Sequence, residues 1–132
     1  MATALFTSFR SARPSDRLPE LRHFYVDALG CTLLGEWVDH EGFDGLIVGG
    51  PPGTWQAEFL HEHARAAPPV PSNVHLLVFY VADRIELAHR AAALGAAGFA
   101  RVEPNNPYWS RHGAVFVDPD GYHVVLAVPH GT

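Results

Sequence analysis

Two stretches of the sequence carry the same turn residues and decide the fold. They are GLIVGGPPG, residues 45–53, and GAVFVDPDG, residues 113–121. Two glycines and one proline of the first stretch recur 68 residues later, as Gly45 and Gly113 show. Each stretch leads an apolar run into a turn rich in Gly, Pro or Asp, which is typical of a strand entering a hairpin. The repeat predicts two copies of one structural unit.

A helix is expected before each hairpin, over residues 18–29 and 84–97. The apolar side chains of the first helix recur at spacings of three and four, and they are Leu21, Phe24, Tyr25 and Ala28. That spacing indicates a helix lying on a sheet. Both helices run into a glycine, Gly30 or Gly98, which suits a C-terminal cap.

Strands complete each unit. They are expected at residues 5–12, 32–38, 99–103 and 122–128, besides the hairpin strands. Each half then runs strand, helix, strand, strand, strand, over about residues 4–65 and about residues 72–130. The class is α+β within a single domain over residues 1–132, with a proline-rich linker near residues 66–72.

Composition limits the possible functions. The chain has 132 residues, of which 48% are hydrophobic, and suits one domain with a real core. Its formal charge of −5 and lack of a basic stripe argue against a nucleic-acid partner. No apolar run is long enough to cross a membrane. The lone Cys31 cannot form an intrachain disulfide, so we expect the protein to be located in the reducing cytoplasm. Arg10 and Arg13 before the first acid also fit a transit peptide, but a strand is expected there.

Three features together resemble the vicinal oxygen chelate superfamily of glyoxalases, extradiol dioxygenases and bleomycin-resistance proteins. They are FYVDALG at residues 24–30, VFVDPDG at residues 115–121, and the duplicated order itself. RSARP at residues 10–14 and NPYWS at residues 106–110 look like one glyoxalase-like branch. The resemblance implies two βαβββ modules that form a cup-shaped mixed sheet, with the helices outside and a small-molecule site inside.

The resemblance also implies where a metal would bind. Family enzymes hold a divalent ion with His or Gln on the first strand of a half and Glu on the last. Here the first strand has Ser8 or Phe9 at its ligand position, and Val125 replaces a family Glu. We therefore expect no cofactor and no tightly bound catalytic metal. Should a divalent ion bind, Glu58 and His75 are the remaining candidates.

Glu58 is the candidate catalytic residue. With the offset of 68 residues, Glu58 corresponds to Leu126 of the second half rather than to Val125. Its side chain therefore points into the cup only if the turn at residues 51–52 is one residue longer than its counterpart in the second half. In the cup it could act as a general base, or it could simply pair with an arginine, Arg10 or Arg13.

His61 and His63 follow Glu58 closely, and imidazoles are ordinary metal ligands. They also lie where a strand gives way to the linker, where solvated histidines are common. We expect them to be solvated.

Four side chains are expected to bind a ligand, namely Arg10, Tyr80, Trp109 and His123. Arg10 can clamp a carboxylate, although a shift of one residue would replace it with Ser11 or Arg13. Because side chains alternate along a strand, Tyr80 and His123 are both expected to point into the cup. Trp109 lies in an expected loop, where it could bind a ligand or cover a sheet edge.

Two functions follow from the resemblance. The first is a protein that binds a small oxygenated or aromatic molecule in its cup, as bleomycin-resistance proteins do. The alternative is a lyase or dioxygenase that uses Glu58 as general base or metal ligand. A homodimer is expected, because family members often brace their cups with a second copy and long hairpin edges need covering.

Overall fold

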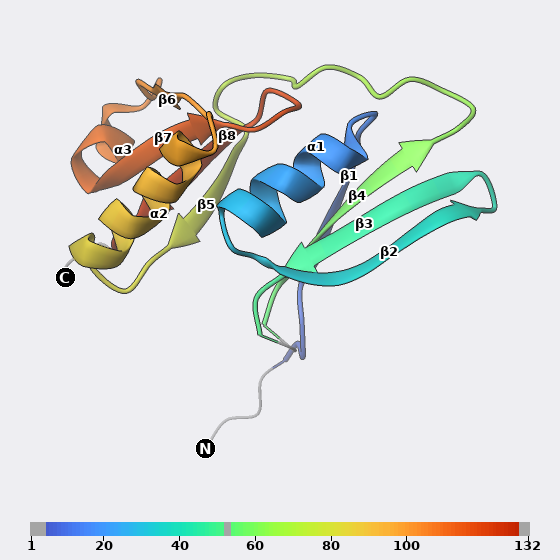
Figure 1. Ribbon diagram of the computed structural model, residues 1–132, viewed down its shortest axis with the longest axis horizontal. Coiled ribbons are helices and arrows are strands. Elements are labelled where there is room, and N and C mark those ends of the chain that lie inside the picture. The colour runs from blue at the N-terminus through green and yellow to red at the C-terminus, as the bar shows by residue number, and fades with distance from the viewer. Residues whose placement is uncertain (1–4, 52–53, 130–132) are drawn as a thin grey trace. The chain divides into compact units, whose positions relative to one another are not determined.

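The computed structural model describes residues 5–51 and 54–129 of the chain. The chain divides into two units, residues 1–68 and residues 69–132, and each is described by itself. In both units, a strand is followed by a helix and then by three more strands (Figure 1). The duplicated βαβββ order predicted from the spacing of turn residues is confirmed.

The first unit is a four-stranded sheet with one helical segment. Its elements are β1 (Arg10–Pro14), α1 (Leu18–Arg22), η1 (His23–Ala28), β2 (Thr32–His40), β3 (Phe43–Gly49) and β4 (Gln56–Glu62). The strand order is β1-β4-β3-β2, with β1 parallel to β4 and the other pairs antiparallel.

The core of the first unit lies between this helical segment and one face of the sheet. Tyr25 stacks on Phe59 of β4 with ring centroids 5.2 Å apart, and Leu21 is fully buried beside them. The segment changes from α to π geometry at η1, where the N–H of Leu29 donates to the carbonyl of Phe24 at 2.9 Å. It stops before Gly30, whose φ of 93° admits the left-handed turn.

The second unit repeats the plan. Its elements are β5 (Leu76–Tyr80), α2 (Arg84–Ala96), β6 (Arg101–Val102), α3 (Pro107–His112), β7 (Gly113–Val117) and β8 (His123–Ala127). The order β5-β8-β7-β6, with β5 parallel to β8, matches the first sheet strand for strand. Asp83 caps α2 by accepting the N–H of Glu86 at 2.9 Å, and Gly98 with a φ of 93° follows the helix.

The turn between β7 and β8 forms as its sequence predicts. One carboxylate oxygen of Asp118 accepts the N–H groups of Asp120 at 2.9 Å and Tyr122 at 3.0 Å. Gly121 takes a φ of 95°, which side chains rarely adopt. The hairpin is therefore fixed by its own residues.

Two expected boundaries differ. The first strand begins at Arg10 rather than at residue 5; the carbonyl of Phe9 just before it accepts the N–H of Gln56 of β4 at 2.8 Å, but the Phe9 side chain remains exposed. Trp109 lies in the short helix α3 rather than in a loop, since the Asn106 side chain accepts the N–H of Tyr108 at 3.0 Å and so caps that helix. Within the described residues, no helix has both the length and the apolarity to span a bilayer.

A close approach fixes Trp37 on the first sheet. Gly45 of β3 pairs with Trp37 of β2, and a Cβ on Gly45 would overlap the indole ring. Ile47, two residues along β3 and therefore on the same face, lies opposite Glu58 of β4. The indole thus covers the sheet face that carries Glu58, which we call the Glu58 face.

We expect Gly45→Ala to lower the free energy of unfolding by about 1–3 kcal/mol, because the added methyl must displace the indole. Gly95→Ala is the control, since nothing lies within 4 Å of a Cβ there. In helix α2 it should stabilise by about 0.5–1 kcal/mol. Denaturant unfolding measures both changes, and an unchanged Gly45→Ala variant would contradict the placement of Trp37.

Candidate functional site

The pairing registers place Glu58 at the family position. Ile47 lies opposite Glu58 in the first sheet, and Val115, which stands 68 residues after Ile47, lies opposite Val125 in the second. Glu58 therefore corresponds to Val125 and not to Leu126. The first unit's turn is one residue longer than its counterpart, which is the condition that the sequence left open.

Glu58 shares its face with a small polar network. Arg10 Nη1 lies 3.8 Å from Glu58 Oε1, and Arg10 Nε donates to Gln56 Oε1 at 2.6 Å. The Glu58 side chain is 14% exposed, against 46% for Arg10. An ion pair this long and half open contributes about 0–1 kcal/mol to stability. Gln56, which sequence reasoning did not single out, holds the guanidinium more closely than Glu58 does.

The other three predicted binding residues lie in the second unit, on one face of its sheet. Tyr80 pairs with Ala127 across β5 and β8, and His123 lies four residues before Ala127 on the same face. Trp109 of α3 packs against a buried cluster on that face that includes Val125 and Ala127. Tyr80 is exposed, whereas His123 is half buried. We call this the His123 face.

His123 and Trp109 line a very small cavity of about 10 Å³ beside Val115 and Val125. The Nδ1 atom of His123 is buried and has no hydrogen-bond partner among the described residues. An unsatisfied buried polar atom costs about 1–3 kcal/mol. The second unit therefore presents a polar atom that a bound molecule could satisfy.

A cluster that sequence reasoning missed lies on the opposite face of the first sheet. Asp44 of β3 pairs with His61 of β4, and Asp44 Oδ1 lies 2.8 Å from Nε2 of His63. His61 Nδ1 lies 3.1 Å from Asp16 Oδ1. The two histidines were expected to be solvated, and both side chains are partly exposed, at 37% for His61 and 40% for His63, but each also has a carboxylate partner. Strand parity and the hairpin register are the signal that could have revealed the pair.

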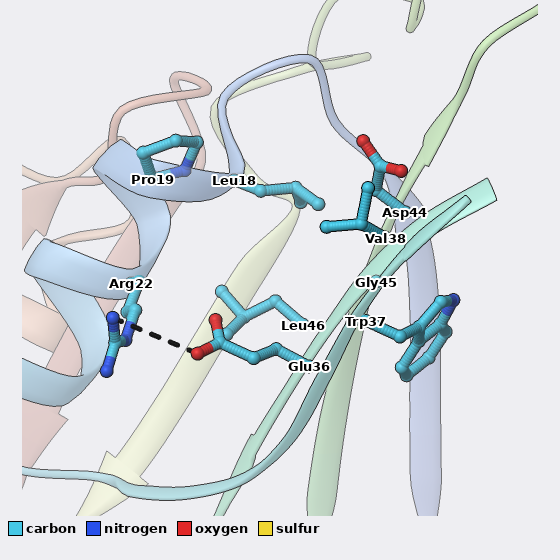
Figure 2. A pocket seen from close by; sticks show the side chains of 9 residues that line it. All are labelled: Leu18, Pro19, Arg22, Glu36, Trp37, Val38, Asp44, Gly45 and Leu46. Carbon is cyan, nitrogen blue, oxygen red and sulfur yellow. Dashed lines mark ion pairs between the residues drawn. The ribbon is translucent and has the colours of Figure 1, made fainter. Parts of the chain in front are cut away.

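A groove of about 470 Å³ runs between α1 and the β2–β3 edge of the first sheet (Figure 2). Leu18 and Pro19 of α1 line one side, and Val38 and Leu46 line the strand side. Figure 2 shows the side chain of Leu46 pointing toward α1 and Trp37 pointing away from it. The groove therefore lies on the face opposite Glu58, and sequence reasoning did not predict it.

Comparison with known proteins identifies the relatives of this fold. A model of the YycE-like N-terminal domain matches residues 9–60, and a model of the YycE-like C-terminal domain matches residues 74–128. YycE of Bacillus subtilis strain 168, described as uncharacterized, is 39% identical over 126 residues, which cover 92% of this chain and 91% of the relative. The chain belongs to the YycE-like family.

Solved structures extend the YycE-like assignment to the superfamily. The crystal structure of Bacillus subtilis YycE, described as a candidate glyoxalase or fosfomycin resistance protein of unknown function, matches with a TM-score of 0.86 and 37% identity, covering 96% of this chain and 92% of that one. The glyoxalase I of Leishmania major matches with a TM-score of 0.71 and 19% identity, covering 90% and 84%. TnmS3, an antibiotic-binding protein of Streptomyces sp. CB03234, matches with a TM-score of 0.65 and 24% identity, covering 98% of each chain. The predicted resemblance to the vicinal oxygen chelate superfamily is confirmed.

The strand positions of this YycE-like chain do not fit the metal implied by the superfamily. The first-strand position, Ser8 or Phe9, precedes β1 and offers no imidazole or carboxylate, and Val125 of β8 stands where the resemblance implies a Glu, so Glu58 is the one carboxylate among these positions. His75 precedes β5, and its Nδ1 lies 2.8 Å from the hydroxyl of Ser72. It lies in the other unit from Glu58. The donor set is too poor to hold an ion in the family manner.

The hydrogen bonds of Asp44 shift two pKa values. The backbone N–H of Asp39 and the imidazole of His63 lower the pKa of Asp44 below 3.8. The Asp44 hydrogen bond raises the pKa of His63 above 6.5, with a smaller contribution from the charge of Asp39. Stabilisation by the pair is therefore lost as pH rises through the raised pKa of His63, and as pH falls through the lowered pKa of Asp44.

We expect an NMR titration of the His63 imidazole to give a pKa above 6.5 in the parent and a lower value in Asp44→Asn, because the charged acceptor is removed. The parent should also lose the contribution of this pair to stability as pH rises through that pKa, and the variant should not. Identical His63 titrations in the two proteins would contradict the hydrogen bond as the cause.

Proposed function

We propose that this YycE-like chain binds a small, partly aromatic molecule with an acid or phenol group, without the metal of the superfamily enzymes. One observation carries the proposal. Of the positions at which the resemblance implies family ligands, Ser8 or Phe9 and Val125 offer no imidazole or carboxylate, whereas Glu58 keeps a carboxylate, and Arg10 lies beside it. A metal-dependent reaction needs more donors than these positions supply, whereas binding needs only complementary polar groups in an apolar surface.

The groups around these positions suit such a ligand. The Arg10 guanidinium is partly exposed and offers a planar fork to a carboxylate. In the second unit, Trp109 offers an aromatic ring, and a polar ligand atom near His123 Nδ1 would offset the cost of its burial. The exposed Tyr80 on the same face adds a hydroxyl. Each unit therefore supplies groups that match an aromatic acid or a phenol.

The relatives are compatible with this proposal. TnmS3 shares the fold and is named as an antibiotic-binding protein, and the Bacillus subtilis relative is described in terms of fosfomycin resistance or glyoxalase activity. Binding of a compound therefore has a precedent on this architecture. The fold itself carries many functions, so the proposal depends on the residues above.

A second candidate is a lyase or dioxygenase in which Glu58 removes a proton or helps to hold a metal. The low exposure of Glu58 favours it, because a carboxylate that is largely shielded from water can contact a substrate directly. Arg10 would then orient the substrate. Turnover of a bound compound that is lost in Glu58→Gln, with binding retained, would select this alternative.

A thermal-shift screen with small aromatic carboxylic acids and phenols tests the site. We expect phenol hits to stabilise the parent and to lose most of that shift in Glu58→Gln, because a neutral amide accepts the phenol hydroxyl less strongly than a carboxylate does. Glu36→Gln is the matched control, since Glu36 also lies 3.8 Å from an arginine, Arg22, but on the groove side of the sheet. Its shifts should equal those of the parent.

Two variants test the second unit in the same screen. Trp109→Ala removes a ring that also packs on the core, so Tyr80→Phe, which removes only an exposed hydroxyl, is measured beside it. We expect both to weaken the shifts produced by phenols. If hits stabilise Glu58→Gln, Trp109→Ala and Tyr80→Phe as much as the parent, the site lies elsewhere.

We also propose that the protein is a cytoplasmic homodimer. In the described residues, the sheets end in β1 and β2, and in β5 and β6, and such edges expose unpaired backbone groups. A second copy covering an edge would satisfy these groups. Sedimentation at micromolar concentration should give twice 14.4 kDa, and a species of 14.4 kDa alone would refute the dimer.

A further inference from the structure

Three side chains with metal-binding chemistry lie together at one end of the first sheet. Asp44, His61 and His63 each offer one ligand atom, and these atoms all lie within 4.8 Å of one another. We propose that they form a binding site for a divalent transition-metal ion of the zinc class. The site is distinct from the superfamily position at Glu58, which lies on the opposite face of the same sheet.

The hairpin register brings these residues together. Asp44 and His61 are direct partners across β3 and β4, so both side chains point to the same face. His63 follows the end of β4, and its N–H donates to the carbonyl of Gly42 at 2.9 Å. The backbone that carries the three ligands is therefore held by hydrogen bonds before any ion binds.

Carboxylates stand behind both histidines. His61 Nδ1 lies 3.1 Å from Asp16 Oδ1, and the other oxygen of Asp16 accepts the N–H of Ala67 at 2.9 Å. His63 Nδ1 lies 3.7 Å from Asp39 Oδ1. Histidine ligands commonly donate their second ring N–H to a carboxylate, which fixes the ring and leaves Nε2 to the metal, as the contact of His61 with Asp16 allows; Asp39 is too far from His63 for a hydrogen bond and contributes charge alone.

The donor set selects the kind of ion. Two imidazoles and one carboxylate suit zinc, nickel, copper or iron, whereas magnesium and calcium prefer oxygen ligands alone. Zinc at about 2.0–2.1 Å from each donor places the donor atoms roughly 3.3 Å apart. The contact of 2.8 Å between His63 and Asp44 is already close to that spacing, and the ligand atom of His61, which lies within 4.8 Å of both, moves closer when the ion binds.

The site is accessible. His63 is exposed and Asp44 lines the groove beside α1, while Figure 2 shows the Asp44 carboxylate pointing away from Arg22 and Glu36. Asp16 and Asp39 add negative charge, which favours a cation. Three protein ligands leave a coordination position for water or for an anionic group that enters the groove.

Titration of the full chain with zinc chloride, after treatment with a chelator that is then removed, tests the proposal by calorimetry. We expect about one ion per chain. His61→Gln and His63→Gln should each weaken binding by at least about 10-fold, and Asp16→Asn, which removes a carboxylate behind a ligand, by about 10–100-fold. Cobalt(II) gives a second readout, since its visible absorption in the parent should be lost in His63→Gln.

Two control variants locate the bound zinc. His23→Gln removes an imidazole that also pairs with a carboxylate, Asp27 at 3.2 Å, but that within the described residues belongs to no group of three possible metal ligands. Glu58→Gln removes the superfamily position. Both should bind zinc as the parent does, and Glu58→Gln should still lose the organic ligand shifts, so the two proposals can fail separately. The site is refuted by a parent that binds no zinc at millimolar concentration, by unchanged binding in His61→Gln and His63→Gln, or by loss of zinc in Glu58→Gln.

Discussion

The pairing of the first strand of each unit with its last strand is the constraint from which the other features follow. β1 runs parallel to β4 and β5 runs parallel to β8, and parallel neighbours cannot be joined by a tight turn. The chain between them therefore includes a helix, which must cover one face of the sheet. The opposite face of the sheet is not covered by this helix and can carry polar side chains. Because side chains alternate along β4, Glu58 falls on the open side and Phe59 in the core.

The features that depend on nearby residues, namely the turns and the helix that follows the first strand of each unit, were predicted from the sequence. Turn residues such as Gly121 and the carboxylate of Asp118 specify their hairpin within a few positions, and the helices follow from apolar spacing and from the glycines that end them. The start of the first strand depends on a distant partner instead. Phe9 fits a strand by composition and its carbonyl accepts the N–H of Gln56, but the paired strand begins only at Arg10, and that start depends on β4 rather than on the residues next to Phe9.

The candidate site shows the same division. The face of Glu58 depended on a single added residue in a turn, which the sequence could state as a condition but not decide. The predicted pairing of Glu58 with Arg10 needed only their proximity on adjacent strands, and it is present. The grouping of Asp44 with His61 and His63 depends on the hairpin register and on a ring orientation set by Asp16, and neither is visible in the spacing of histidines alone.

The π-helical turn η1 shows that part of the sequence resemblance to the superfamily reflects packing in the core. Its wider winding lets two adjacent rings, Phe24 and Tyr25, both be fully buried, with Tyr25 stacked on Phe59. The two rings of the FYVDALG stretch that helped to reveal the resemblance are therefore part of the core, whereas Asp27 in the same stretch is exposed. Likeness in these rings reflects a shared scaffold, and the chemistry of the chain depends on residues elsewhere on its exposed faces.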